Sequence, residues 1–342
     1  MKSLLTGSPR QFALLSAGIA LILALSLGSL FFLNTRYLKS GEQEKITIGT
    51  APLESSALVY IAQKQGFFAD NGLTVSIREY DTGAASTEGL LKGEVDIGLP
   101  AEYALVGKAF QKKEIRAIAS IDKAEYFYLI ARRDRGIINA ADLKGKRIGV
   151  VTKTIAEYYL GRFLELHGLN VGKVIPVHIG ISRSEEAIVD GRIDAIISRP
   201  PQMAAIQKRL GANAISWPAQ GSQALHAVMI GRNRWLQEHP KTIQLLLRSL
   251  MRAQEYLIQF PLDAKAIVRE QLRVDDAYID TVWSQNQFAL TLDQSLITAM
   301  EDEARWMIES HLTTEEKIPN FRDYTHPEGL RMMKPEAVRI IQ

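Results

Sequence analysis

From residue 46 onwards, short apolar runs alternate with segments whose apolar residues recur every three or four positions. The runs Ile46–Gly49 and Arg147–Val151 have the length and composition of buried strands. Each is followed by a segment with the spacing of a helix that buries one face, Ala57–Gln65 and Ala156–His167. A second predicted strand follows each helix, at Thr74–Tyr80 and Val174–His178.

The chain also repeats a phrase. Leu91–Gly98 matches Val189–Ile196 at an offset of 98 residues. Alternating strands and helices imply right-handed crossovers and parallel-type sheets with helices on both faces. We therefore predict an α/β protein of two similar lobes whose strand carboxyl ends share a cleft. The alternative is that any two α/β units look alike. Asp96 and Asp194 hold the same place in both halves, which favours a structural role over a catalytic pair.

The predicted first lobe comprises residues 46–133 and 225–342, and the second comprises residues 134–224. The polar segment Arg133–Lys144 is interpreted as one crossing between the lobes, and the apolar strand Ala224–Gly231 as the return. Two such crossings would act as a hinge. The remainder is predicted to be helical at 240–260, 262–271, 275–289 and 293–310, followed by a surface tail over Lys317–Gln342 that packs on the first lobe.

The N-terminus is predicted to be an export segment. Residues 1–11 carry Lys2 and Arg10 and would be cytoplasmic, residues 12–33 are 22 residues without a charge, and residues 34–45 form a polar linker. The apolar stretch is either a cleaved signal peptide or an uncleaved transmembrane anchor, and its length favours the anchor. We expect the protein in the periplasm, free or anchored to the inner membrane.

Composition excludes several classes of function. The formal charge of +3 falls to +1 without Lys2 and Arg10, so no basic face for nucleic acid is indicated. The absence of cysteine excludes disulfides, thiolate metal sites and lipid attachment through an N-terminal cysteine. The chain lacks nucleotide-binding glycine motifs and the nucleophile-elbow motif, and its six histidines have no metal-site spacing. We predict no catalysis, no cofactor and no metal.

Polar turns follow the first strand of each half, at Glu54–Ser56 and Thr152–Thr154. Thr154 occupies a helix N-cap position, where free backbone amides could hold an anion or a polar head group. Helix capping alone is the commoner reason for a threonine there.

Three phrases resemble a known family. Ala141–Val150, Tyr60–Leu73 (with its A-x-x-x-G-F-F segment) and Gly191–Ala195 followed by Pro200 are similar to periplasmic substrate-binding proteins of the nitrate/sulfonate/taurine group, NMT1/THI5-like. The resemblance covers residues 45 to 340. It implies a bilobed type II binding protein, without catalytic residues, that closes on a small ligand and presents it to an ABC permease.

Matching that family residue by residue implies a set of ligand contacts at the strand ends. In the first lobe they are Ser55, Ser56, Gly83, Ser86, Glu102 and Tyr103; in the second they are Lys153, Thr154, Tyr158, Ser182, Arg183 and Arg199. Helix capping is the alternative for each serine and threonine.

Two of these positions bear on the charge of the ligand. The guanidinium of Arg199 could grip a carboxylate, sulfonate or phosphonate. Glu102 departs from the small neutral residues of the family. Either it pairs with Lys153 or Arg199 across the empty cleft, or the ligand carries an amine as well as an acid.

The leading hypothesis is a monomeric solute-binding protein of an ABC importer, with a small, anionic, sulfonate-, nitrate- or taurine-like ligand. The alternative is a membrane-anchored, ligand-sensing subunit of a signalling partner. An enzyme on the same scaffold has the least support, because the family's eukaryotic pyrimidine-synthesising members use a cysteine-rich motif and this chain has no cysteine.

Overall fold

The computed structural model describes residues 43–341. Within this range no helix has the length and apolar character needed to cross a bilayer. The predicted export segment, residues 12–33, lies outside the described residues, as do the predicted cytoplasmic N-terminus and most of the linker.

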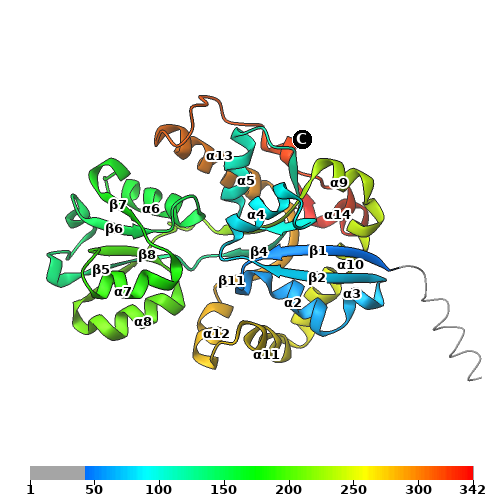
Figure 1. Cartoon of the computed structure of the whole chain (residues 1–342), viewed down its shortest axis with the longest axis horizontal. Coiled ribbons are helices and arrows are strands. Elements are labelled where there is room, and N and C mark those ends of the chain that lie inside the picture. The colour runs from blue at the N-terminus through cyan, green and yellow to red at the C-terminus, as the bar shows by residue number, and fades with distance from the viewer. Residues whose placement is uncertain (1–42, 342) are drawn as a thin grey trace, which may run out of the picture. The chain divides into compact units, whose positions relative to one another are not determined.

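The described chain forms two α/β lobes, each built on one sheet (Figure 1). The first lobe begins with alternating strands and helices that enter a seven-stranded sheet of order β12-β11-β4-β10-β3-β1-β2. Its N-terminal elements are β1 (Glu44–Thr50), α2 (Ala57–Lys64), α3 (Phe67–Asp70), β2 (Leu73–Glu79), α4 (Gly83–Lys92), β3 (Ile97–Leu99), α5 (Glu102–Phe110) and β4 (Ile115–Ala124).

The second lobe contains a five-stranded sheet of order β7-β6-β8-β5-β9. Helices α6, α7 and α8 connect its strands and cover its faces (Figure 1). The elements are β5 (Tyr128–Arg132), β6 (Arg147–Val150), α6 (Ile155–Leu166), β7 (Ile175–His178), α7 (Ser184–Val189), β8 (Ala195–Ser198), α8 (Pro200–Leu210) and β9 (Ala214–Pro218).

The chain then returns to the first sheet and ends in a mainly helical region. One face of helix α10 packs in the core of the first lobe. Its buried apolar residues include Ile243, Leu246, Leu247 and Leu250. The elements are β10 (Leu225–Arg232), α9 (Asn233–Glu238), α10 (Pro240–Gln259), α11 (Pro261–Leu272), α12 (Asp276–Trp283), β11 (Asn286–Asp293), α13 (Gln294–Glu309), α14 (Glu328–Met333) and β12 (Val338–Arg339).

The predicted two-lobed α/β architecture is confirmed, although both sheets are mixed. In the first lobe β1 and β3 are parallel, while β10 runs antiparallel to β3 and β4. In the second lobe β6 is parallel to β7 and β8, while β5 runs antiparallel to β8 and β9. Strands β10 and β5 each follow a crossing, and they run antiparallel to their neighbours because a chain that enters from the other lobe arrives at the opposite end of the sheet.

The internal repeat is confirmed and has a hydrogen-bonding reason. The carboxylate of Asp96 accepts the backbone N–H of Thr47 at 2.8 Å, and that of Asp194 accepts the N–H of Arg147 at 2.9 Å. Each aspartate therefore satisfies an amide in the first strand of its half. Gly93 and Gly191 precede them with φ of 76° and 73°, a left-handed turn that favours glycine. The repeated phrase encodes this junction.

The predicted lobe boundary was placed one strand too late. Strand β5 pairs with β8 and β9, so it belongs to the second lobe, and the first crossing is the segment 125–127 between β4 and β5. Residues Arg133–Lys144 form turns and short 3-10 helices within the second lobe. Glu125 is the exposed, charged residue of this crossing, but the sequence pattern does not tell whether the apolar strand that follows it joins the first or the second sheet.

Two predictions for the C-terminal region were also wrong. The helix predicted over 275–289 ends at Trp283, and β11 begins at Asn286 and pairs antiparallel with β4. Leu290 and Leu292 of β11 are buried at a period of two. The tail predicted after Lys317 does pack on the first lobe, but it does not stay on the surface, because Phe321 and Leu330 lie in the core and β12 extends the sheet beside β11.

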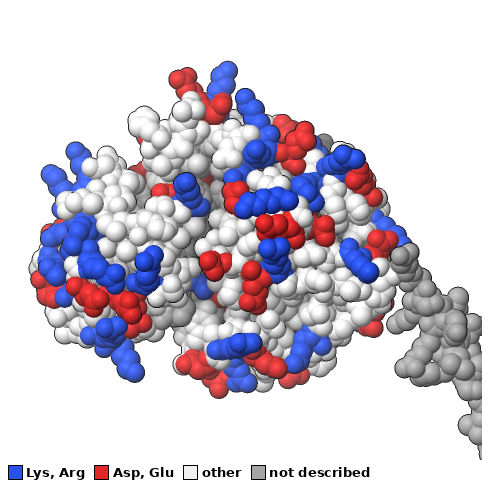
Figure 2. Space-filling model, in the orientation of Figure 1, with Lys and Arg blue, Asp and Glu red and all other residues white. Residues whose placement is uncertain are grey.

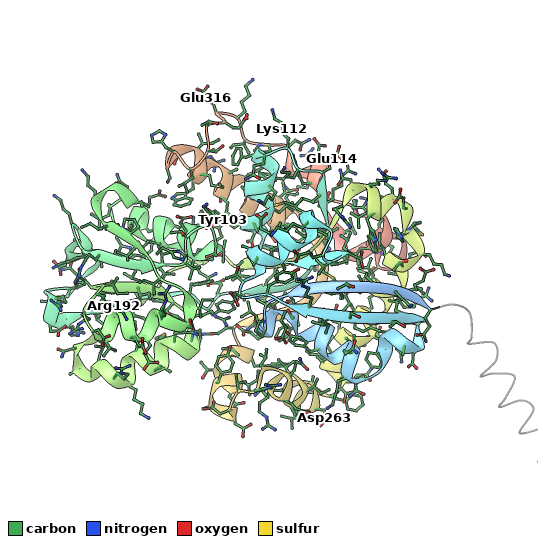
Figure 3. All side chains as sticks on the ribbon, in the orientation of Figure 1. Tyr103, Lys112, Glu114, Arg192, Asp263 and Glu316 are labelled. Atoms are coloured by element: carbon green, nitrogen blue, oxygen red, sulfur yellow. The ribbon has the colours of Figure 1, made fainter. Side chains whose placement is uncertain are left out.

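The surface has no dominant charge on the face shown in Figure 2, where acidic and basic side chains are interspersed over both lobes. Figure 3 labels Tyr103 where the two lobes meet, and Arg192 and Asp263 at the periphery. Tyr103 is buried, whereas the latter two are exposed. An aromatic cluster from both lobes fills the junction, including Tyr103 and Trp306 of the first lobe and Tyr158 and Tyr159 of the second.

Candidate ligand-binding cavity between the lobes

The two chain crossings are joined by one buried side chain. Oε1 of Gln220 accepts the backbone N–H groups of Tyr126 at 2.6 Å and Phe127 at 2.8 Å. Its Nε2 donates to the carbonyls of Ala124 at 3.0 Å and Gln223 at 2.9 Å. Gln220 is on the return segment, so its amide holds the outgoing and returning chains together where the lobes connect.

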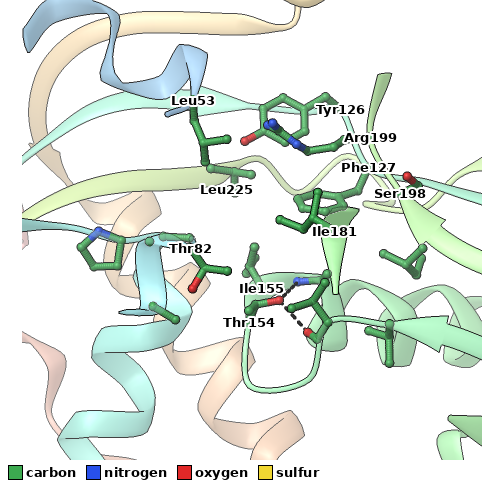
Figure 4. A pocket seen from close by; sticks show the side chains of 18 of the residues that line it. Leu53, Thr82, Tyr126, Phe127, Thr154, Ile155, Ile181, Ser198, Arg199 and Leu225 are labelled. Carbon is green, nitrogen blue, oxygen red and sulfur yellow. Dashed lines mark hydrogen bonds between the residues drawn. The ribbon is translucent and has the colours of Figure 1, made fainter. Parts of the chain in front are cut away.

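A cavity of about 130 Å³ lies beside these crossings, between the lobes. Helices α4, α5, α6 and α8 begin at its wall, after the carboxyl ends of strands from both sheets. Side chains from both lobes and from the crossing face one another across it (Figure 4). Most of its lining is apolar, including Leu53 and Leu225 from the first lobe, Phe127 from the crossing, and Ile155, Ile181 and Ile197 from the second lobe.

Two threonines at the wall cap helices. The hydroxyl of Thr82 accepts the N–H of Ala85 at 3.1 Å at the start of α4. Thr154 accepts the N–H of Ala156 at 3.3 Å and donates to the carbonyl of Val151 at 2.7 Å (Figure 4). The capping alternative for Thr154 is confirmed, and the same side chain lines the cavity.

A buried ion pair joins the lobes at one end of the cavity. Arg199, the residue before α8, donates from Nη1 to Oε1 of Glu54 at 2.9 Å. The carboxylate is fully buried, and its Oε2 accepts the hydroxyl of Tyr278 from α12 at 2.8 Å. The guanidinium carbon of Arg199 lies 5.6 Å from the centre of the Tyr126 ring. Two lobes thus supply one neutral, hydrogen-bonded pair.

The pair also changes the acidity of the groups around it. Burial lowers the pKa of Arg199, but the carboxylate of Glu54 and the phenols of Tyr126 and Tyr278 raise it, and the net shift is upward. Burial, followed by the charge of Glu54, raises the pKa of both tyrosines. Arg199 is therefore held as a cation, and in this structure Glu54 is its partner.

Of the twelve residues predicted as ligand contacts, the structure brings Ser55, Gly83, Thr154 and Arg199 to the cavity wall. Gly83 is small for a reason the sequence did not reveal. A Cβ there would lie 2.9 Å from Cα of Pro100 and 3.0 Å from the carbonyl oxygen of Leu99. The start of α4 is thus pressed against the end of β3, and the missing side chain serves that contact.

Four first-lobe residues do not line the cavity, because the fold engages them elsewhere. The Ser56 hydroxyl lies 2.6 Å from that of Thr50, and Ser86 joins α4 to β3 through the N–H of Leu99 at 3.2 Å. Tyr103 packs in the aromatic cluster at the junction. The fourth residue, Glu102, is fully buried.

Glu102 does not pair with Lys153 or Arg199, contrary to one of the two explanations offered for it. Its Oε2 accepts the backbone N–H of His226 at 2.9 Å, and burial raises its pKa. The buried Glu303 of α13 has its pKa raised by burial and by Glu102. Burial therefore favours the protonated forms of both carboxyl groups.

The remaining second-lobe predictions also fall outside the cavity. Tyr158 donates to the side chain of Gln223 at 2.8 Å within the aromatic junction. Lys153 is exposed and lines a separate groove of about 690 Å³, while Ser182 and Arg183 are exposed in the turn before α7. Proximity to a strand end in the sequence did not distinguish the inner wall from the outer surface.

Sequence reasoning did not reveal that Glu54, which is buried behind the wall, is the partner of Arg199. The loop that contains Glu54 was singled out, but the two residues are 145 positions apart and nothing local connects them. Gln202, in the first turn of α8, was also missed; its buried Oε1 lines the cavity without a hydrogen-bond partner. Within residues 43–341 no cluster of three or more His, Asp or Glu side chains could hold a metal ion.

Two lobes, two joined crossings and a cavity at the strand ends define the periplasmic-binding-protein fold. A similar structure is that of the periplasmic aliphatic sulphonate binding protein of Escherichia coli, with a TM-score of 0.69 and 15% identity. The alignment covers 82% of this chain and 97% of that one. At this level of identity the likeness shows the fold.

The sequence comparison then gives the family. The family model described as NMT1/THI5 like matches residues 54–264, and the chain belongs to this family. A Brucella abortus protein named as a candidate binding protein is 26% identical over 245 residues, 70% of this chain and 74% of its own. The 4-amino-5-hydroxymethyl-2-methylpyrimidine phosphate synthase of Uromyces fabae is 27% identical over 209 residues, 56% of this chain and 60% of its own.

Proposed function

We propose that this protein is an extracytoplasmic solute-binding protein that closes its lobes around a small organic molecule. The observation that carries the proposal is the cavity of about 130 Å³ between two lobes that are joined by two crossings. Ligand pockets of open α/β sheets lie at the strand carboxyl ends, and a two-lobed chain can open such a pocket by hinge motion.

The partner in this proposal is the permease of an ABC importer in the inner membrane. Membership of the NMT1/THI5-like family supports it, together with the likeness to the sulphonate binding protein of Escherichia coli. The apolar residues 12–33 would act as an export signal or as an anchor to the inner membrane. A monomer is expected, because one chain supplies both walls of the cavity.

The ligand is proposed to have an apolar body. Most side chains at the cavity wall are apolar, and a nitrate ion would leave them uncovered. A sulfonate- or taurine-like molecule has an organic body, but its acidic group would have to share Arg199 with Glu54.

Binding without chemical change is part of the proposal. The Uromyces fabae relative is named as a synthase, whereas the Brucella abortus relative is named as a binding protein. The titratable side chains at the described cavity wall are Asp81, Tyr126 and Arg199, a set without a nucleophile and base in contact. Incubating the purified protein with its ligand and finding a new product by mass spectrometry would contradict this part.

A second candidate function is a ligand-sensing subunit, which the long apolar segment 12–33 favours if it stays uncleaved. Affinity purification of the full chain from its native membrane distinguishes the two. Recovery of an ABC permease supports import, whereas recovery of a kinase or cyclase supports sensing.

The binding function is tested by native mass spectrometry of the freshly purified full chain in mild detergent. We expect a bound small molecule that is released on unfolding. Ligand returned at a hundred times its dissociation constant should raise the free energy of unfolding by about 2.7 kcal/mol. If no molecule is released, and if a panel of small organic solutes changes neither the melting temperature nor the radius of gyration, the proposal fails.

A further inference from the structure

We propose that the cavity selects an uncharged organic ligand and that Glu54 is the residue that imposes this selection. The inference rests on the proposed function and names the ligand class of the same cavity. It concerns the charge of the ligand's polar end, which neither the fold nor the family determines.

Glu54 already occupies the place that an anionic ligand would take beside Arg199. Its buried carboxylate receives Nη1 of Arg199 at 2.9 Å and the hydroxyl of Tyr278 at 2.8 Å. An anionic ligand at Arg199 would bring a second negative charge against this carboxylate in a water-poor site. Such a juxtaposition of like charges is unfavourable because little solvent screens it. A neutral polar group meets no such repulsion.

The start of helix α8 is poorly suited to hold an anion. Helix starts bind anions through their first free N–H groups. Here the first two residues, Pro200 and Pro201, have no N–H to donate. The N–H of Met203 bonds to the carbonyl of Arg199 at 2.9 Å. Gln202 therefore has the first amide hydrogen of the helix. The set of several free N–H groups that usually binds an anion at a helix start is absent here.

The other charged side chains at the cavity wall offer no unpaired counter-charge at its buried end. Among the described residues that line the cavity, Arg199 and Asp81 are the charged ones. Asp81 is solvent-exposed, so water and salt screen it at the mouth of the cavity. The buried end is therefore neutral overall, since Glu54 balances Arg199. Neither an anion nor a cation finds an unpaired counter-charge there.

The remaining lining indicates what the uncharged ligand presents. The buried Oε1 of Gln202 has no hydrogen-bond partner and would be satisfied by an N–H or O–H of the ligand. A cavity of about 130 Å³ is close in size to the engineered cavity of about 150 Å³ that binds benzene. The geometry therefore suits a ring-sized apolar body with one neutral hydrogen-bond donor, such as an amide.

The test measures dissociation constants of probes that differ in charge and hardly in shape. The probes are benzamide and benzoate, benzenesulfonamide and benzenesulfonate, and benzylamine as a cation. They are titrated into the purified full chain and into its Glu54→Gln variant by calorimetry. Glutamine can still accept from Arg199, and circular dichroism and the melting temperature establish that the variant is folded.

In the wild type we expect each amide to bind at least about tenfold more tightly than its acid. In Glu54→Gln the order should reverse, because Arg199 loses its counter-charge and the acid supplies one. Glu54→Asp keeps the charge and should keep the wild-type order. Glu270→Gln makes the same charge change at an exposed surface pair with Lys64 and should also leave the order unchanged.

Tighter binding of the acids, or of benzylamine, by the wild type would overturn the inference. So would a Glu54→Gln protein that gains no affinity for either acid, since a released Arg199 must then attract an anion. These results do not decide the proposed function, which depends on whether native mass spectrometry finds a bound molecule in the wild type. A released molecule with net charge would overturn the inference and support the function.

Discussion

Asp122 is a carboxyl group that the fold buries with only part of its hydrogen-bonding capacity in use. Oδ1 accepts the N–H of Gln287 at 3.0 Å, whereas Oδ2 is buried without a partner. Burial, and then the nearby charge of Glu54, raises the pKa of Asp122 from 3.8 to about 8. A single residue thereby makes the stability of the protein depend on pH near neutrality.

The sign of this dependence follows from the raised pKa. The folded state retains a proton on Asp122 that the unfolded chain loses above about pH 3.8, so this stability is fully present in acid and is lost as the pH rises towards about 8. We expect the free energy of urea unfolding to fall by up to about 1.4 kcal/mol per pH unit from this group between pH 6 and 8.

Asp122→Asn should reduce that slope, because asparagine is uncharged at every pH. The slope should not vanish, since burial shifts the pKa of Glu102 in the same direction. Asp302→Asn, at a surface pair with Arg305, should keep the wild-type slope. Equal slopes in the wild type and Asp122→Asn would contradict this account.

At the scale of elements, the contact of α4 with the end of β3 shapes one wall of the cavity. Gly83 begins α4, and an added Cβ would meet the backbone of Leu99 and Pro100, which cannot rotate away as a side chain can. We expect Gly83→Ala to destabilise the protein by about 1–3 kcal/mol in urea unfolding. Ligand affinity should fall as well, because the wall must shift.

The matched control is Gly107→Ala in the interior of α5. No atom lies within 4 Å of a Cβ built there, and alanine is the better helix former by about 1 kcal/mol. This variant should be neutral or slightly stabilised. If Gly83→Ala behaves like Gly107→Ala, then α4 and β3 are not in the tight contact that we describe.

At the scale of the whole molecule, the aromatic cluster joins the two lobes. Trp306 of α13 in the first lobe lies directly over Gly161 of α6 in the second, where a Cβ would approach the indole ring to 2.3 Å. Gly161→Ala should push α6 from α13 while leaving each lobe folded. We expect a larger radius of gyration in small-angle scattering and weaker retention of ligand.

A second substitution separates this effect from general damage. Trp306→Leu in the Gly161→Ala background removes the ring that causes the clash and should restore a compact scattering profile. Trp306→Leu alone is the control for loss of the aromatic contact. An unchanged radius of gyration in Gly161→Ala, with normal folding, would mean that this contact does not hold the lobes together.

The sequence predicted the fold at the level where local patterns carry the information. Alternating strands and helices, the repeated phrase with its aspartates, and the two-lobed class are all confirmed. The errors lie where neighbouring elements are both apolar. The crossing at 125–127 separates two apolar strands, and β11 follows α12 after only two residues, so their assignment depends on which sheet each strand joins.

The candidate site was predicted less well than the fold. Ser55, Gly83, Thr154 and Arg199 reach the cavity wall because they follow strand ends that face the other lobe. Tyr158 and Ser86 occupy similar places in the sequence, yet their hydroxyls bond within the protein. Position along the chain determines which strand end a residue follows, but not whether its side chain turns towards the cavity or the core.

The sequence alone determined that this protein has two α/β lobes with polar turns and an arginine at the strand ends, because period and capping are local properties of the chain. Only the tertiary structure decided that Arg199 is neutralised by Glu54, since that pair joins residues 145 positions apart and from different lobes. The same contact changes the expected ligand from an anion to an uncharged molecule. A charge read from sequence is therefore incomplete until the fold supplies its partner.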